Sequence, residues 1–177
     1  HSTSRRQRQM CIRDRGLYYA RTDVGGAYRY NKDTQKWESM SYDISEEDRG
    51  LLGIEGLAFG EKDPNKVYML AGTEYFSNGK TCLLYSDDYG KTWNRTELTD
   101  MITAHGNGMG RGNGERIAVD PKNSDIVYVG GRTGGIIKST DGGKTFTALD
   151  MGTKTTTSNG NGICLSLIHI SEPTRPE

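Results

Sequence analysis

The sequence predicts an all-β protein. Among its 177 residues are 24 Gly and 10 Tyr. Short apolar or alternating stretches follow turn-forming residues along the chain, which is typical of antiparallel strands, and a repeated turn motif described below strengthens this prediction. No apolar run reaches the roughly 18 residues that a membrane-spanning helix needs. The formal net charge of 0 gives no reason to expect nucleic acid as a partner.

The two ends differ abruptly in composition from the rest of the chain. Codons that can encode Met10 to Arg15 have a reverse complement that encodes LSLIHI, the sequence of Leu165 to Ile170. An inverted repeat at the two ends of a reading frame is typical of translated sequencing adaptors. We therefore predict that residues 1–15 and 165–177 are disordered, adaptor-like ends and that residues 16–164 form the folded part.

Internal repeats are the strongest signal in residues 16–164. Two stretches, SDDYGKTW at Ser86 to Trp93 and STDGGKTF at Ser139 to Phe146, fit S-x-D-x-G-x-T-[W/F] and lie 53 residues apart. Each follows three strand-like stretches, so each unit is predicted to be a four-stranded meander of about 55 residues, the size of a propeller blade. A degenerate unit precedes them, and Gly162 begins a fourth. The chain is thus predicted to be a partial β-propeller of about three blades.

The repeated motif, here called the Asp-box turn, has a structural explanation. Its Asp can accept hydrogen bonds from backbone N–H groups of its own turn. Its Gly supplies a positive φ, and its aromatic residue packs between sheets. The alternative of a calcium loop lacks the D-x-[DN]-x-[DN]-G spacing, and we predict no metal and no cofactor. The predicted structural residues are Ser86, Asp88, Gly90 and Trp93 in one turn and Ser139, Asp141, Gly143 and Phe146 in the other.

One family combines these motifs in the same order. ARTDVGGAYRYN at Ala20 to Asn31, GIEGLAF at Gly53 to Phe59, the Asp-box turns and GERIAVDP at Gly114 to Pro121 closely resemble glycoside hydrolase family 74. The resemblance implies a secreted, extracellular enzyme with two seven-bladed propellers facing across a cleft, which cleaves β-1,4-glucan backbones such as xyloglucan with inversion. The chain would then be a fragment of the N-terminal propeller, and its partner would be the missing second propeller.

The resemblance also assigns a general base. Asp23 lies between the second and third strands of the first unit, which places it on the opposite face from the Asp-box turns and beside Gly25 and Gly26. The structural alternative is that Asp23 caps its own tight turn. Inverting hydrolysis also needs a carboxylic acid, which the family carries in its second propeller. Because Glu55, Glu74 and Glu115 lack a matching motif, we expect the fragment alone to be inactive.

Sugar polymers are usually bound by aromatic faces and planar polar groups. The cleft-face loops offer Tyr42, Tyr75, Phe76 and Arg111 as substrate-binding candidates. The glycine-rich run from His105 to Glu115 lacks G-x-G-x-x-G, so we expect a mobile cleft loop and not a phosphate site.

Two alternatives remain open. A sortilin-like Asp-box propeller would be a binding module without catalysis. A sialidase-like enzyme would need an arginine cluster and a Tyr nucleophile for a carboxylated sugar, and the sequence shows no such set.

Overall fold

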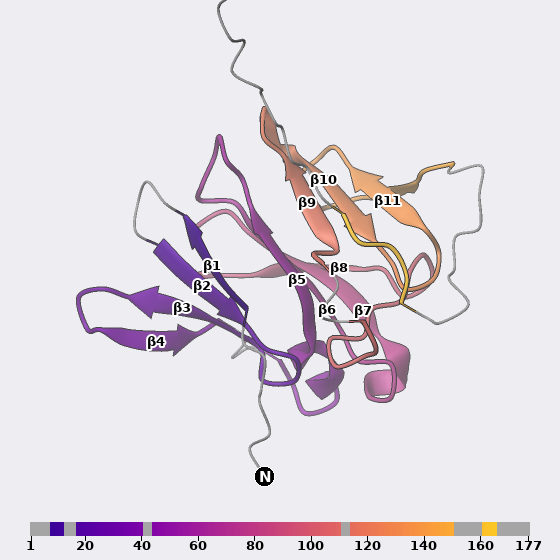
Figure 1. Cartoon of the computed structure of the whole chain (residues 1–177), viewed down its shortest axis with the longest axis horizontal. Coiled ribbons are helices and arrows are strands. Elements are labelled where there is room, and N and C mark those ends of the chain that lie inside the picture. Colours follow the sequence, from indigo (N-terminus) through magenta and orange to yellow (C-terminus); the bar gives the residue numbers. More distant parts are fainter. Residues whose placement is uncertain (1–7, 13–16, 41–43, 111–113, 151–160, 166–177) are drawn as a thin grey trace, which may run out of the picture.

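The computed structural model describes residues 8–12, 17–40, 44–110, 114–150 and 161–165. In these residues it contains three antiparallel sheets of four strands each, which lie side by side like the blades of a fan (Figure 1). The prediction of an all-β partial propeller is confirmed. The strands are β1 (Arg8–Ile12), β2 (Leu17–Arg21), β3 (Ala27–Asn31) and β4 (Lys36–Ser39) in the first sheet, β5 (Ile54–Phe59), β6 (Val67–Gly72), β7 (Thr81–Ser86) and β8 (Asn94–Glu97) in the second, and β9 (Ile117–Asp120), β10 (Asn123–Gly130), β11 (Ile136–Ser139) and β12 (Thr147–Ala148) in the third.

Strand β1 differs from the expectation of disorder for residues 1–15. Arg8 to Ile12 pair with β2 in an antiparallel register from Arg8 opposite Arg21 to Ile12 opposite Leu17. A sheet edge presents unpaired N–H and C=O groups, and a strand of almost any sequence can satisfy them through its backbone. Composition therefore does not reveal this pairing, which gives the first sheet its fourth strand.

The central sheet packs on both faces. Along β6 the side chains alternate: Val67, Met69 and Ala71 belong to the core shared with the first sheet, and Tyr68 and Leu70 to the core shared with the third. Every residue of β6 is buried. This double coverage explains why its sequence reads as a continuous apolar run and not as an alternation.

Successive units are joined by one recurring hydrogen bond. The N–H of Ile54 donates to Thr22 (3.2 Å), that of Gly106 to Gly72 (2.9 Å) and that of Ile163 to Gly131 (3.1 Å). In each pair a residue at or before the start of the next unit binds the end of the second strand of the unit before. Residues 161–165 thus take up the position expected for the start of a fourth unit, and Leu165 forms a β-bridge with Glu115.

Two short 3-10 helices, η1 (Arg49–Leu52) and η2 (Ser77–Gly79), lie in the loops that follow β4 and β6. Within the described residues no helix has the length and apolar character to cross a membrane.

Candidate active site

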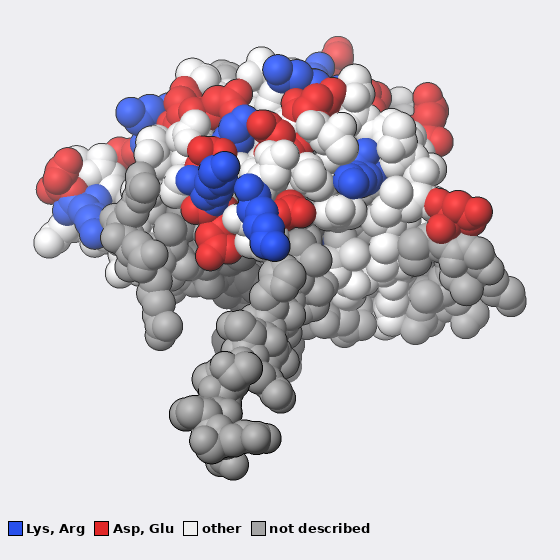
Figure 2. Space-filling model, turned by 90° about the horizontal axis from the view of Figure 1, so that it is seen from above, with Lys and Arg blue, Asp and Glu red and all other residues white. Residues whose placement is uncertain are grey.

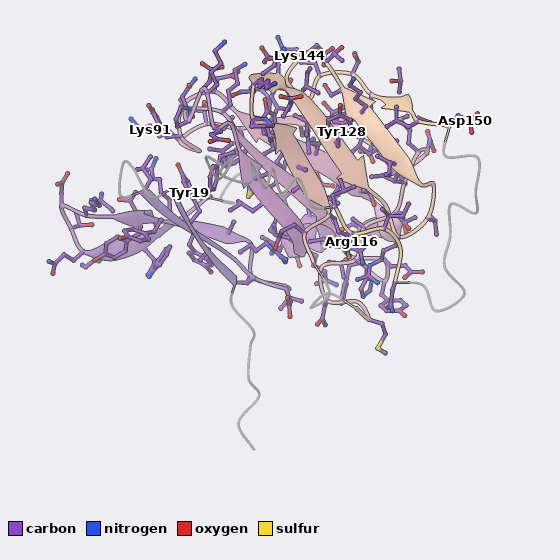
Figure 3. The ribbon with its side chains drawn as sticks, turned by 45° about the horizontal axis from the view of Figure 1, so that its top comes forward. Tyr19, Lys91, Arg116, Tyr128, Lys144 and Asp150 are labelled. Carbon is purple, nitrogen blue, oxygen red and sulfur yellow. The ribbon has the colours of Figure 1, made fainter. Side chains whose placement is uncertain are left out.

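The two ends of the sheets have different characters. The Asp-box turns, marked by Lys91 and Lys144, lie at one end, and Arg116 lies toward the other (Figure 3). The Asp-box end is covered by Lys, Arg, Asp and Glu side chains of interspersed sign (Figure 2). At the opposite end, loops between the second and third strands of a sheet meet the loops between sheets. Gly26 of the β2–β3 loop donates its N–H to Leu52 (2.7 Å), and Arg132 of the β10–β11 loop donates its N–H to Thr103 (2.9 Å). We call this second end the loop face.

The Asp-box turns are closed by their own side chains. Asp88 Oδ1 accepts the hydroxyl of Ser86 (2.7 Å) and the N–H groups of Lys91 and Thr92 (2.9 Å each), and its Oδ2 accepts the Thr92 hydroxyl (2.6 Å). Asp141 makes the same set of bonds in the third sheet. Partial burial alone would raise the pKa of Asp88, but these donors outweigh it and hold that pKa at about 2. A carboxylate committed to its own turn has a structural role.

Asp23 lies on the loop face, in a turn closed by hydrogen bonds of Thr22. The Thr22 hydroxyl donates to the carbonyl of Gly26 (2.8 Å) and accepts the N–H of Gly25 (2.7 Å). Gly26 has a φ of 75°, which a side chain would strain. Gly53 lies so close that a Cβ there would be 3.1 Å from the Asp23 carbonyl and only 2.1 Å from the Thr73 hydroxyl. The half-buried Asp23 is therefore held at a defined place on the loop face.

A groove begins beside this turn. A hollow of about 350 Å³ is lined by Val24, Arg49, Leu52, Gly53, Thr73 and Phe76. A more open hollow of about 890 Å³ shares Arg49 and Phe76 with it and extends to Tyr75. The Arg49 guanidinium stands 5.4 Å from the centroid of the Phe76 ring. The two hollows together form a depression that leads away from the Asp23 turn.

Large exposed apolar side chains gather along this depression. Tyr75 is 81% exposed, Phe76 47% and Val24 51%, so two of the predicted substrate-binding residues flank the groove. The other two, Tyr42 and Arg111, lie outside the described residues. Val24 and Arg49, which also line the groove, were not predicted from the sequence.

Behind the groove lies a buried ionic cluster that the sequence did not indicate. The Glu55 carboxylate is 2.6 Å from Arg116 Nε and 2.7 Å from Arg132 Nε. Arg21 NH2 is 3.3 Å from Glu115 Oε1, and its NH1 donates to the Ile54 carbonyl (3.0 Å). Three buried arginines, Arg21, Arg116 and Arg132, thus take part in these ion pairs. They are at most 6% exposed and are bound to carboxylates and carbonyls, so they do not form an open site for a carboxylated sugar.

The three glutamates considered as general acids differ in surroundings. Glu55 is buried between two guanidinium groups, and Glu115 pairs with Arg21. Glu74 is 64% exposed at its side chain. Two of the three are thus bound to arginine partners, and the third is open to solvent. The described part of the chain also contains no group of three or more His, Cys, Asp or Glu side chains that could hold a metal ion.

The glycine-rich run was expected to be a mobile loop, but its first part is anchored. Glu55 accepts the N–H of His105 (2.7 Å), and Arg132 donates to the carbonyls of His105 (3.2 Å) and Met109 (2.6 Å). Residues 111–113 lie outside the described residues.

Comparison with known proteins gives a consistent result. No family model matches the chain. A xyloglucanase of Hypocrea jecorina is 42% identical over 148 residues, which cover 81% of this chain and 17% of that protein. An oligoxyloglucan-reducing end-specific xyloglucanase of Emericella nidulans is 37% identical over 150 residues, which cover 85% of this chain and 18% of that protein. The chain therefore spans less than a fifth of the length of these relatives.

Solved structures agree with the sequence relatives. The GH74 enzyme of Niastella koreensis is 47% identical with a TM-score of 0.84, and the match covers 88% of this chain and 23% of that one. The GH74 xyloglucanase of Xanthomonas campestris is 38% identical with a TM-score of 0.71, and the match covers 76% of this chain and 19% of that one. With the repeated units and the Asp23 turn in the order described above, these likenesses in sequence and structure place the chain in glycoside hydrolase family 74.

Proposed function

We propose that this chain is part of an inverting glycoside hydrolase that cleaves the β-1,4-glucan backbone of xyloglucan, with Asp23 as its general base. The observation that carries the proposal is the position of Asp23 in a fixed turn at the edge of a groove flanked by Tyr75 and Phe76. The two curated relatives described above are named as xyloglucanases, which supports the substrate class.

The chemistry requires two carboxyl groups. A carboxylate activates water on one side of the scissile bond, and a protonated acid about 6.5–9.5 Å away donates to the leaving oxygen. Asp23 supplies the first, and none of Glu55, Glu74 and Glu115 is suited to the second. We propose that the acid belongs to a second propeller beyond this chain and that the fragment alone is inactive.

Substrate binding uses the groove. A neutral sugar ring offers apolar C–H faces, which pack on aromatic side chains such as Tyr75 and Phe76. Tyr42 and Arg111 are proposed as further contacts. A polymeric plant-type glucan is met outside the cell, so the whole protein is proposed to be extracellular.

Replacement of the base tests the proposal. In the full-length protein that carries this segment, Asp23→Asn is expected to lower kcat on xyloglucan by about 10²–10⁴-fold, the usual contribution of general acid–base catalysis, while binding is retained. Asp33→Asn is the matched control, because Asp33 is an exposed aspartate in the same sheet, in the β3–β4 turn.

Three results would contradict the proposal in different ways. Full activity of Asp23→Asn would make Asp23 a turn residue only. A full-length protein that neither binds nor cleaves xyloglucan would favour a non-catalytic Asp-box binding module. Equal losses in Asp23→Asn and Asp33→Asn would point to a general effect of charge.

A further inference from the structure

We propose that Arg132 is a positioning residue for substrate binding: with Glu55 it holds residues 105–109 against the loop face, and this segment orients Tyr75. The inference rests on the proposed function, because it concerns how one side of the groove is held. Arg132 lies in the β10–β11 loop, and Tyr75 in the β6–β7 loop of the neighbouring sheet.

The anchor of this arrangement is Glu55, which is 2% exposed. One carboxylate oxygen lies between Arg116 Nε and Arg132 Nε, and the other accepts the N–H of His105. Two cations and one N–H group compensate the cost of burying this charge. Because Arg116 remains beside Glu55 when Arg132 is replaced, the carboxylate keeps a cationic partner in such a variant.

Arg132 connects this anchor to the segment at two further points. Its NH2 donates to the His105 carbonyl (3.2 Å) and its NH1 to the Met109 carbonyl (2.6 Å). The planar guanidinium can bind a carboxylate and two carbonyls at once in a fixed geometry, which a lysine ammonium cannot reproduce. The ends of residues 105–109 are thereby fixed relative to β5.

The segment is packed tightly as well as hydrogen-bonded. A Cβ on Gly108 would lie 2.5 Å from His105 Cδ2 and 2.7 Å from Arg132 Cζ. A Cβ on Gly106 would lie 2.6 Å from the carbonyl carbon of Gly53, which itself lies against the Asp23 turn. Any shift of the segment is therefore transmitted to its neighbours.

His105 carries the contact to the groove. Its Nδ1 accepts the N–H of Glu74 (2.9 Å), so the backbone next to Tyr75 is fixed by this ring. The rings of Tyr75 and His105 meet edge to face with centroids 5.0 Å apart. Because Tyr75 is 81% exposed, little other packing orients its ring, and the His105 contact governs the direction in which it faces a sugar.

Steady-state kinetics of the full-length protein on xyloglucan test the inference. Tyr75→Ala and Arg132→Gln are each expected to raise KM about tenfold with kcat nearly unchanged, as expected when binding shared by ground and transition states is removed. If Arg132 acts through Tyr75, the double variant has the KM of Tyr75→Ala alone. Rescue by Arg132→Lys is expected to be poor because of the lost geometry.

The control for lost stability is Tyr68→Phe. It removes a buried hydrogen bond between the second and third sheets, from the Tyr68 hydroxyl to the Ser124 carbonyl (2.7 Å), away from the groove. It is expected to lower the melting temperature and to leave KM unchanged. If Arg132→Gln does not fold, His105→Ala replaces it, and its KM is compared with those of Tyr75→Ala and of the double variant of His105 and Tyr75.

The outcomes separate the two proposals. If Tyr75→Ala leaves KM unchanged, the proposed binding role of Tyr75 fails, and this inference fails with it. The positioning role of Arg132 is overturned if Tyr75→Ala raises KM but Arg132→Gln does not. It is also overturned if the two effects on KM multiply in the double variant. In both cases the proposed binding role of Tyr75 in the groove is retained.

Discussion

Tyr89 is a residue whose backbone conformation suits glycine better than tyrosine. It has a φ of 62° in the Asp-box turn of the second sheet, and the third sheet has Gly142 at the same place with a φ of 75°. Its carbonyl accepts the hydroxyl of Tyr19 and a guanidinium N–H of Arg29, both at 3.2 Å. These contacts are made by the backbone carbonyl of residue 89 and not by its ring. The left-handed conformation costs about 1–2 kcal/mol at this residue.

Replacing this residue by one that tolerates the conformation should stabilise the protein. Tyr89→Asn is expected to raise the free energy of unfolding by about 0.5–1 kcal/mol, because Asn adopts the left-handed region at lower cost and the carbonyl contacts remain. Gly142→Ala is the converse control and should destabilise, since its Cβ would also lie 2.9 Å from Asp125 Oδ1. Urea unfolding measures both, and a less stable Tyr89→Asn would show that the tyrosine ring contributes more than the strain costs.

The Asp-box turn is the element that the sequence predicted in most detail. Its spacing places one carboxylate within reach of several donors of the same turn, and local contacts of this kind can be read from sequence. In the first sheet Asn31 stands at the end of the third strand, where the other turns have the motif serine, and its Oδ1 accepts the N–H groups of Asp33 (2.9 Å) and Thr34 (3.1 Å). The degenerate motif thus closes its turn with a neutral acceptor.

Because of these turns, the stability of the fold should decrease as the pH falls in the acid range. Donors led by Thr145 lower the pKa of Asp141 from 3.8 to about 2. A group whose pKa is lower in the folded state stabilises the fold above its unfolded pKa, and the stabilisation is lost as pH falls from about 4 to about 2. Asp141→Asn should cost about 1–2 kcal/mol at pH 7 and flatten the dependence of the melting temperature between pH 5 and pH 2.

The control is Asp33→Asn, which removes an exposed carboxylate of the first sheet. It should change neither the free energy of unfolding at pH 7 nor the dependence of the melting temperature on acid pH. An unchanged acid slope in Asp141→Asn would mean that other carboxylates dominate the acid response.

At the scale of the whole molecule, the repeats predicted the three sheets, and the order of motifs predicted the end of the sheets at which Asp23 lies. The ionic cluster was not predicted, because its members are far apart in sequence: Arg21 and Glu115 are separated by 94 residues. No local pattern reports such a pairing. The anchoring of residues 105–109 was missed for the same reason, since glycine richness indicates freedom of the chain unless distant side chains bind its carbonyls.

The proposal that the general acid belongs to a second propeller leads to a prediction for the chain as it stands. The 177-residue chain is expected to release no oligosaccharide from xyloglucan, whereas the full-length protein releases them, because general acid catalysis needs the second group. Reducing-end assays on both proteins measure this difference. Hydrolysis by the short chain, abolished by Asp23→Asn, would show that an acid lies within it.

The recurring hydrogen bond between units has a consequence for folding cooperativity. Because the bonds from Ile54, Gly106 and Ile163 are alike, each unit is coupled to its neighbour by a similar interface. A row of such units behaves as a one-dimensional chain with nearest-neighbour coupling, in which the ends fray first. Among corresponding second strands, hydrogen exchange should then be slower in β6 of the central sheet than in β2 and β10 of the outer two, and a closed ring, which has no ends, would remove this gradient.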